Sequence, residues 1–379
     1  MSKRILLSTC CLVIVSMVLH GQPLPNPPPE GPSQIAKFFP AAALTASINP
    51  TAAGLQNVQT LVGGYITPIA EDFGGLISNG WYNTGANHKR FGFDLSIAIN
   101  AVSANSASKY YSINALQGVA YNGTQPTSSG AGKAPTAYGP ESEFPSFNFN
   151  SGPNNLIPFY GPSGGNISKD VPIGSIAVPT IQAGIGLFAN TDLRFRFTPE
   201  ITINKTALKS WGVGLLHDIK QHIPGIKMAP ISLSLLLAYS QMTATTDLGG
   251  VYYTQSSGNS FSGQEGLGET KSYTAQILIS KTIPVLTFYG GIGYNSATTT
   301  YAINGSYYVD KAYTDLSVPG ITLPSPVKLV DPFKQDFSVG GIRFTGGIRF
   351  KFGPVFLNTD YTYFNSKGLY TMGFGFTIH

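Results

Sequence analysis

The sequence predicts an all-β protein: a transmembrane, antiparallel, up-and-down β-barrel of about ten strands, with about 12 to 14 strands as the alternative. Apolar and polar residues alternate with period two in runs long enough for a tilted strand to cross a bilayer. Charged residues make up only 11% of the chain, whereas a soluble protein carries about a quarter. No stretch of about 18 apolar residues follows residue 21, which excludes membrane-spanning helices.

The alternation is clearest in the last three runs, over residues 342–352, 355–363 and 370–378. In the final run Thr or Gly separates large apolar residues, namely Tyr370, Met372, Phe374, Phe376 and Ile378. A soluble sandwich buries its apolar face, whereas a membrane barrel turns that face to lipid and its polar face to the lumen. The low charge favours the membrane barrel.

Seven earlier runs bring the total to about ten strands: 91–103, 176–188, 192–203, 209–218, 231–245, 270–283 and 286–302. If the C-terminus is periplasmic, the barrel of residues 91–379 has three long extracellular loops, 104–175, 246–269 and 303–336. Short turns at 189–191, 282–285 and 353–354 then lie inside, as in outer-membrane barrels. The first loop is rich in Gly, Pro, Ser and Asn, and only residues 110–121 suggest order.

The N-terminal part divides into three predicted segments. Lys3 and Arg4 precede an apolar run, which predicts a signal peptide over residues 1–21. Residues 22–34 form a proline-rich extended leader, and residues 35–82 a helical segment that plugs the lumen or lies in the periplasm. The strand count places these helices in the periplasm, with interruptions at Pro50 and Pro68.

Both cysteines, Cys10 and Cys11, lie in the predicted signal peptide. The mature chain is therefore expected to have no disulfide and no thiol site.

Three stretches carry a resemblance to a known family: residues 80–84 (Gly-Trp-Tyr-Asn-Thr), 191–200 and 212–225, the last with His-Asp-Ile-Lys-Gln at 217–221. They resemble an uncharacterised family of outer-membrane β-barrels common in Bacteroidota. The resemblance implies the fold and the location, since that family has no assigned activity. Residues 49–52 (Asn-Pro-Thr-Ala) are faintly similar to an element of long-chain fatty-acid transport barrels.

Period-two alternation places nine charged residues in the lumen: Asp94, Asp192, Arg194, Arg196, Glu200, Arg343, Arg349, Lys351 and Asp360. Opposite signs alternate on neighbouring positions, which favours a ladder of salt bridges that fills a small barrel. The alternative is a narrow path that slightly prefers anions.

Aromatic residues gather in the first long loop: Phe144, Phe147, Phe149, Phe159 and Tyr160. They predict an apolar capture site, or simply a packed loop. His217 and Asp218 are the only His/acid pair, but adjacent strand residues point to opposite faces and no Gly-x-Ser-x-Gly elbow accompanies them. We therefore expect no enzyme activity, catalytic residue, cofactor or metal site.

These patterns predict an outer-membrane channel or uptake protein for a small, apolar molecule. The alternative is a structural or surface-interaction protein that acts through its long loops. The expected partners are outer-membrane lipid and lipopolysaccharide, the barrel-assembly machinery during insertion, and a small apolar ligand. No nucleic-acid partner is expected, because Lys and Arg form no cluster.

Overall fold

The computed structural model describes residues 35, 37–39, 41, 52–103, 106–113, 116–125, 132–150, 156–166, 175–203, 206–248, 263–309 and 327–378. The predicted signal peptide and leader, residues 1–34, lie outside the described residues, as do Pro50 and His379.

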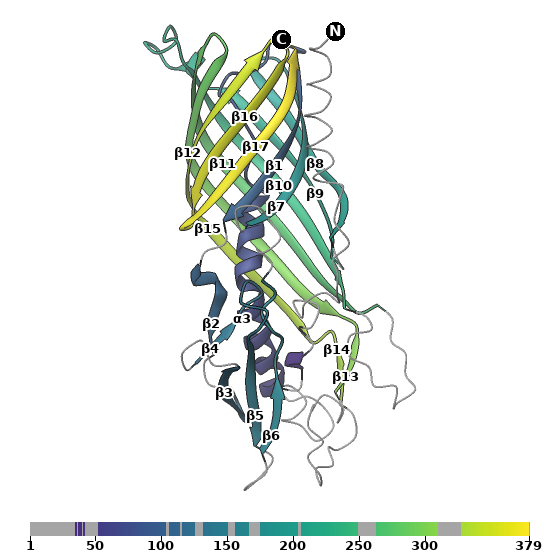
Figure 1. Cartoon of the computed structure of the whole chain (residues 1–379). Helices are drawn as coiled ribbons and strands as arrows, with labels where there is room; N and C mark the ends of the chain where they lie inside the picture. Colours follow the sequence, from purple (N-terminus) through teal and green to yellow (C-terminus); the bar gives the residue numbers. More distant parts are fainter. Residues whose placement is uncertain are drawn as a thin grey trace, which may run out of the picture.

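Ten strands close into one barrel in the order β1-β17-β16-β15-β12-β11-β10-β9-β8-β7, and all neighbours are antiparallel (Figure 1). The strands are β1 (Phe93–Ser103), β7 (Ser175–Gly186), β8 (Thr191–Ile203), β9 (Thr206–Asp218), β10 (Ser232–Asp247), β11 (Glu265–Ile283), β12 (Leu286–Asn304), β15 (Phe333–Phe352), β16 (Val355–Phe364) and β17 (Lys367–Ile378). The predicted up-and-down barrel of ten strands is confirmed.

The two faces of the wall follow the predicted alternation. Large apolar side chains point outward and stay exposed, among them Ile342 (58%), Phe374 (41%) and Ile378 (48%). Polar side chains between them point inward and are buried. This arrangement is that of a transmembrane β-barrel, because only a lipid environment favours such an apolar exterior. Among the described helices, none is both long and apolar enough to cross a bilayer.

The barrel has a short-turn end and a long-loop end. Residues 187–190, 219–231, 284–285 and 353–354 connect strands at the short-turn end, where the C-terminus lies. Residues 104–174, 248–264 and 305–332 are the long connections at the other end. Two of these loops are shorter than predicted, because β11 already begins at Glu265 and β15 at Phe333.

The first long connection contains ordered structure beyond the predicted residues 110–121. Its short strands are β2 (Tyr110–Ser112), β3 (Val119–Gln125), β4 (Lys133–Pro135), β5 (Phe144–Asn150) and β6 (Leu156–Tyr160). They form two small sheets, and β13 (Ser306–Val309) pairs with β14 (Val327–Val330) nearby. We call this assembly of β2–β6, β13 and β14 the cap.

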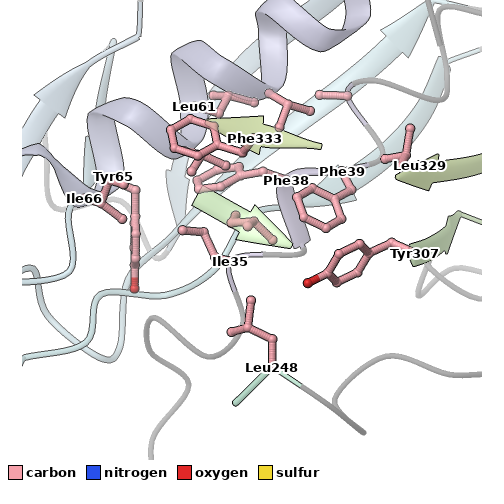
Figure 2. Close-up of a cluster of buried hydrophobic side chains, with 14 of the residues drawn as sticks. Ile35, Phe38, Phe39, Leu61, Tyr65, Ile66, Leu248, Tyr307, Leu329 and Phe333 are labelled. Carbon is pink, nitrogen blue, oxygen red and sulfur yellow. The ribbon is translucent and has the colours of Figure 1, made fainter. Parts of the chain in front are cut away.

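Helix α3 (Ala52–Leu76) joins the cap to the barrel (Figure 1). Its first half packs in the cap core, where Leu61 and Tyr65 lie in one cluster with Phe38, Tyr307 and Phe333 (Figure 2). Its last residue, Leu76, packs against the inner wall of the barrel. The helix therefore enters the lumen from the long-loop end, whereas the strand count places it beyond the short-turn end.

The predicted interruption at Pro68 is also wrong, because α3 continues through it. A proline inside a helix removes one backbone hydrogen bond, at a cost of about 3 kcal/mol. Pro68 is buried, and the Thr67 hydroxyl donates to the Gly63 carbonyl at 2.7 Å. Packing of both halves of α3 thus outweighs the local preference of this residue.

Candidate functional site

Residues 77–88, here called the lumen segment, connect α3 to β1 through the interior of the barrel. Their backbone has no regular helix or strand structure. Most of their side chains are nonetheless buried, including Trp81 at 1% exposure and His88 at 6%. Such a segment needs hydrogen-bond partners from the surrounding wall, because buried backbone groups are rarely left unpaired.

Near the end of α3, Arg343 of β15 holds the segment. Its guanidinium donates to the Ser78 carbonyl at 2.9 Å, to the Ser78 hydroxyl at 2.9 Å and to the Asn79 side-chain oxygen at 2.6 Å. The Asn79 amide donates in turn to the Thr371 hydroxyl at 2.8 Å. Two strands that flank β16 in the barrel wall, β15 and β17, therefore both hold Asn79.

Two arginines of β8 hold the centre of the segment. Arg196 donates to the Asn79 carbonyl at 2.7 Å and to the Ser240 hydroxyl at 2.6 Å, and its guanidinium lies 3.8 Å from the centre of the Trp81 ring. Arg194 donates to the Trp81 carbonyl at 2.6 Å. The cation–π contact and the charge-assisted hydrogen bonds both fix the indole against the wall.

Between Trp81 and the short-turn end, the lumen is filled by apolar side chains. Trp81 and Tyr82 pack with Leu216, Leu236 and Leu278 of the wall. Tyr82 also meets Tyr289 edge to face, with ring centres 5.9 Å apart.

His88 closes the segment at the short-turn end. Its backbone N–H donates to Asp192 at 3.0 Å, and its ring nitrogens lie 2.9 Å from Asp192 and 3.3 Å from Asp94. All three side chains are at least nine-tenths buried. The backbone N–H of Gly85 also donates to the Ser280 hydroxyl at 2.9 Å. The segment is thus attached to the wall along its whole path.

At the level of Leu76 the lumen is apolar. We call the cluster of Leu76, Val102, Val178, Leu208, Met242 and Val339 the apolar layer. It lies between the cap and the arginine-held part of the segment. Along its axis, the lumen therefore changes from this apolar layer near the long-loop end to the arginine-held zone farther in.

An ion-pair lock joins α3 to the rim at the long-loop end. Lys367 contacts Asp72 and lies 3.5 Å from Glu71. The hydroxyl of Tyr138, which lies between β4 and β5 in the first long connection, donates to Asp72 at 2.6 Å. Burial raises the pKa of Tyr138 well above its usual value, so the phenol remains a neutral donor.

Seven of the nine predicted lumen residues do point inward and are buried: Asp94, Asp192, Arg194, Arg196, Arg343, Arg349 and Asp360. Lys351 is half-buried near the short-turn end.

The prediction that Glu200 points into the lumen is wrong: its side chain is exposed, and its carboxylate lies 3.2 Å from the Lys209 ammonium group. A β-bulge between Thr198 and Ile201 reverses the alternation there.

The predicted ladder of salt bridges is wrong in its partners. Within the described lumen, Arg194 and Asp192, 3.5 Å apart, are the one arginine–carboxylate pair. Arg196 and Arg343 bind the lumen segment, and Arg349 lies over the Phe356 ring at 4.2 Å. The prediction paired wall side chains only with one another, because it did not include a segment of chain inside the lumen.

The loop aromatics form part of the cap core. Phe147 and Phe159 are buried and stacked, with ring centres 4.9 Å apart. Phe144 and Tyr160 make an edge contact at 5.4 Å and remain partly exposed. The side chain of Phe149 lies outside the described residues. Phe147 and Phe159 therefore pack the cap rather than offer a capture surface.

His217 lies at the short-turn end and has structural partners. Its ring contacts the Thr191 hydroxyl at 2.8 Å and the His222 ring at 3.0 Å.

Sequence reasoning missed the lumen segment as a group of functional residues. Apart from the family resemblance of residues 80–84, its signal was negative: a polar and aromatic stretch between helix and strand without either periodicity.

The chain belongs to a family of unknown function, DUF6588, which matches residues 33–378. The resemblance to an uncharacterised family is thereby confirmed, whereas the Bacteroidota origin and the similarity to fatty-acid transport barrels remain predictions. No curated protein matches the chain in sequence.

Three bacterial structures illustrate the structural likeness. The attachment invasion locus protein Ail of Yersinia pestis is 7% identical, with a TM-score of 0.25, over 76% of this chain and 100% of that chain. The NalP autotransporter translocator domain of Neisseria meningitidis is 10% identical, with a TM-score of 0.32, over 86% and 99%. The toluene transporter TbuX of Ralstonia pickettii is 8% identical, with a TM-score of 0.22, over 80% and 93%. These remote likenesses carry no argument about function.

Proposed function

We propose that the protein is an outer-membrane β-barrel of a Gram-negative bacterium that takes up a small apolar molecule. In this proposal residues 1–21 export the chain, the short-turn end faces the periplasm and the cap faces outward. The exposed apolar belt supports the membrane location, since it would aggregate in water. Short turns on the inner side and long loops on the outer side support the orientation.

The observation that carries the proposal is the change of lining along the lumen. A molecule that enters at the long-loop end meets the apolar layer around Leu76 first. Farther in, Arg196 and Arg343 hold the lumen segment by charge-assisted hydrogen bonds. An apolar molecule is favoured in the first zone, whereas hydrated ions find the second zone occupied by protein.

The lumen segment also argues against free diffusion of polar solutes. Each hydrogen bond from an arginine contributes about 1.5 to 3 kcal/mol, so several must break together before the segment can leave. We therefore propose that the resting lumen is closed to ions and that uptake does not use an open aqueous pore.

Conductance in a planar bilayer tests this proposal. The mature full-length chain should give no discrete steps, whereas a chain that begins at Phe91, without α3 and the lumen segment, should conduct. Heat-modifiable migration verifies that both have folded. Equal steps from both chains would contradict the closed lumen.

A structural or surface-interaction role is the second candidate, and the cap favours it. The cap has its own buried core, which includes Phe147, Phe159 and Tyr307. A folded surface of this kind suits a binding partner outside the cell. Silence of both folded chains in the bilayer, together with cell binding that depends on residues 132–166, would support this role over uptake.

A further inference from the structure

The wall of the barrel is incompletely paired between β7 and β8. Their ladder runs from Gly186 opposite Asp192 only as far as Ile181 opposite Phe197. Both strands continue beyond this point: β7 stays paired with β1 up to Ser175, and β8 stays paired with β9 up to Ile203. The two strands therefore separate toward the long-loop end, and we call the space between residues 175–180 and 199–203 the side opening.

Local sequence explains the separation. Pro179 and Pro199 have no N–H group and cannot donate to a ladder at this level. The bulge after Thr198 bends β8 and disrupts the register on the same side. The last contact is a substitute for a ladder bond, in which the Thr198 hydroxyl donates to the Pro179 carbonyl at 2.7 Å.

Apolar side chains contribute to both inner edges of the side opening, beside the buried Thr180. Ile176 of β7 and Ile201 of β8 pack against the apolar layer, which includes Val178. Both isoleucines are partly exposed, whereas Met242 in the same layer is 1% exposed. Val178 itself is 4% exposed, so Ile176 and Ile201 are the apolar side chains that are accessible at the side opening.

The outer surface at the foot of the side opening is aromatic. Phe197 is the last residue of β8 that pairs with β7, and it is 39% exposed. On its other side it lies opposite Trp211 of β9, which is 45% exposed. Trp211 continues into a row of rings with Tyr239 and Tyr273. Aromatic girdles mark the interface between membrane and water, so the side opening begins at that interface.

We infer that the side opening is the entrance by which a small apolar molecule passes from the membrane surface to the apolar layer, an inference that rests on the uptake function proposed above. The molecule is recognised by its apolar character, because Ile176, Val178 and Ile201 offer it no charge. This route avoids both the cap and the arginine-held part of the lumen.

Thiol labelling of the full-length protein in lipid vesicles tests the side opening. Ile201→Cys and Ile176→Cys report from its two edges, and Met242→Cys is the matched control in the same layer behind intact wall. Cys10 and Cys11 are replaced in all variants. The probes are neutral N-ethylmaleimide and a negatively charged methanethiosulfonate, with rates normalised to free cysteine.

We expect Ile201→Cys and Ile176→Cys to react with the neutral reagent at least tenfold faster than Met242→Cys. Their normalised rates with the charged reagent should be lower than those with the neutral reagent. Rates as slow as the control at both positions would overturn the side opening. Equal rates with both reagents would overturn its apolar selectivity. Labelling does not depend on conductance, so an ion-conducting full-length chain would contradict the proposed function without affecting this result.

Discussion

Buried arginines in the lumen find most of their described partners on the lumen segment. A guanidinium carries five donors and keeps its charge, so it is stable in a protein interior only with acceptors around it. Arg343 and Arg196 use carbonyl oxygens of Ser78 and Asn79, groups that would otherwise be unpaired. Each of these arginines thus gains acceptors for its charged group and supplies donors to the irregular backbone in the lumen.

Replacement of Arg343 by Ala should loosen the segment. Three hydrogen bonds are lost and the Ser78 carbonyl loses its donor, which we expect to destabilise the fold by about 2 to 3 kcal/mol. Urea unfolding followed by Trp81 fluorescence in a Trp211→Phe background measures the change. Lys281→Ala, on the exposed surface, is the control. Equal effects of the two substitutions would show that Arg343 does not hold the segment.

His88→Ala should free the segment at the short-turn end. The substitution leaves Asp94 and Asp192 without their shared partner, and the exposed Lys89 and Arg90 follow directly in sequence. Trypsin should then cleave after these residues at least tenfold faster than in the parent. His88→Asn keeps one donor for Asp192 and should lie between the two. An unchanged cleavage rate would argue against the anchor.

At the scale of elements, α3 is positioned by packing at both ends. Its first half lies in the cap core and its last turn lies against β12 and β15. Gly74 permits the close approach, because an added Cβ would lie 2.6 Å from the Ala297 side chain and 3.0 Å from that of Val339. A larger residue there cannot fit without movement of the helix.

Gly74→Leu should therefore push α3 away from the wall and destabilise the fold by about 1 to 3 kcal/mol. We expect intermittent conductance in a planar bilayer, which the parent lacks. Thr60→Leu, on the exposed side of the same helix, should remain silent. A silent Gly74→Leu variant with parental stability would mean that the helix does not contact β12 and β15.

Phe147→Ala should unfold the cap and leave the barrel intact. The ring is fully buried between Phe159 and Phe38, so its loss should cost about 3 to 5 kcal/mol. Hydrogen exchange should accelerate over residues 132–166 and stay unchanged in β10–β12. Tyr160→Ala, at an exposed ring, is the matched control. Acceleration throughout the barrel would show that the cap is not an independent unit.

At the scale of the whole molecule, the sequence predicts the wall but not its contents. Alternation is a local property, so the two faces of β17 or β15 can be identified without knowledge of their neighbours. The bulge that turns Glu200 outward breaks this rule at a single point. The cap strands escaped prediction because they are short and lie between stretches rich in Gly, Pro and Ser.

The lumen segment could not be predicted for a different reason. Its position depends on contacts distant in sequence, such as Asn79 with Thr371 and Ser78 with Arg343. The strand count correctly placed the start of β1 at the short-turn end. It missed that the preceding residues cross the barrel, and so it assigned α3 to the wrong side.

A disulfide between Asn79→Cys and Thr371→Cys tests the central claim, that residues 77–88 occupy the lumen. The two side chains are in contact, at 2.8 Å between Nδ2 and Oγ1, and Cys10 and Cys11 are replaced to leave no other thiol. Mild oxidation of the folded protein should join the two positions, as detected by peptide mapping. Asn79→Cys with Met372→Cys, which faces outward at 64% exposure, should not form the bond. A failure of the first pair, or equal formation in both, would contradict a lumen filled by its own chain.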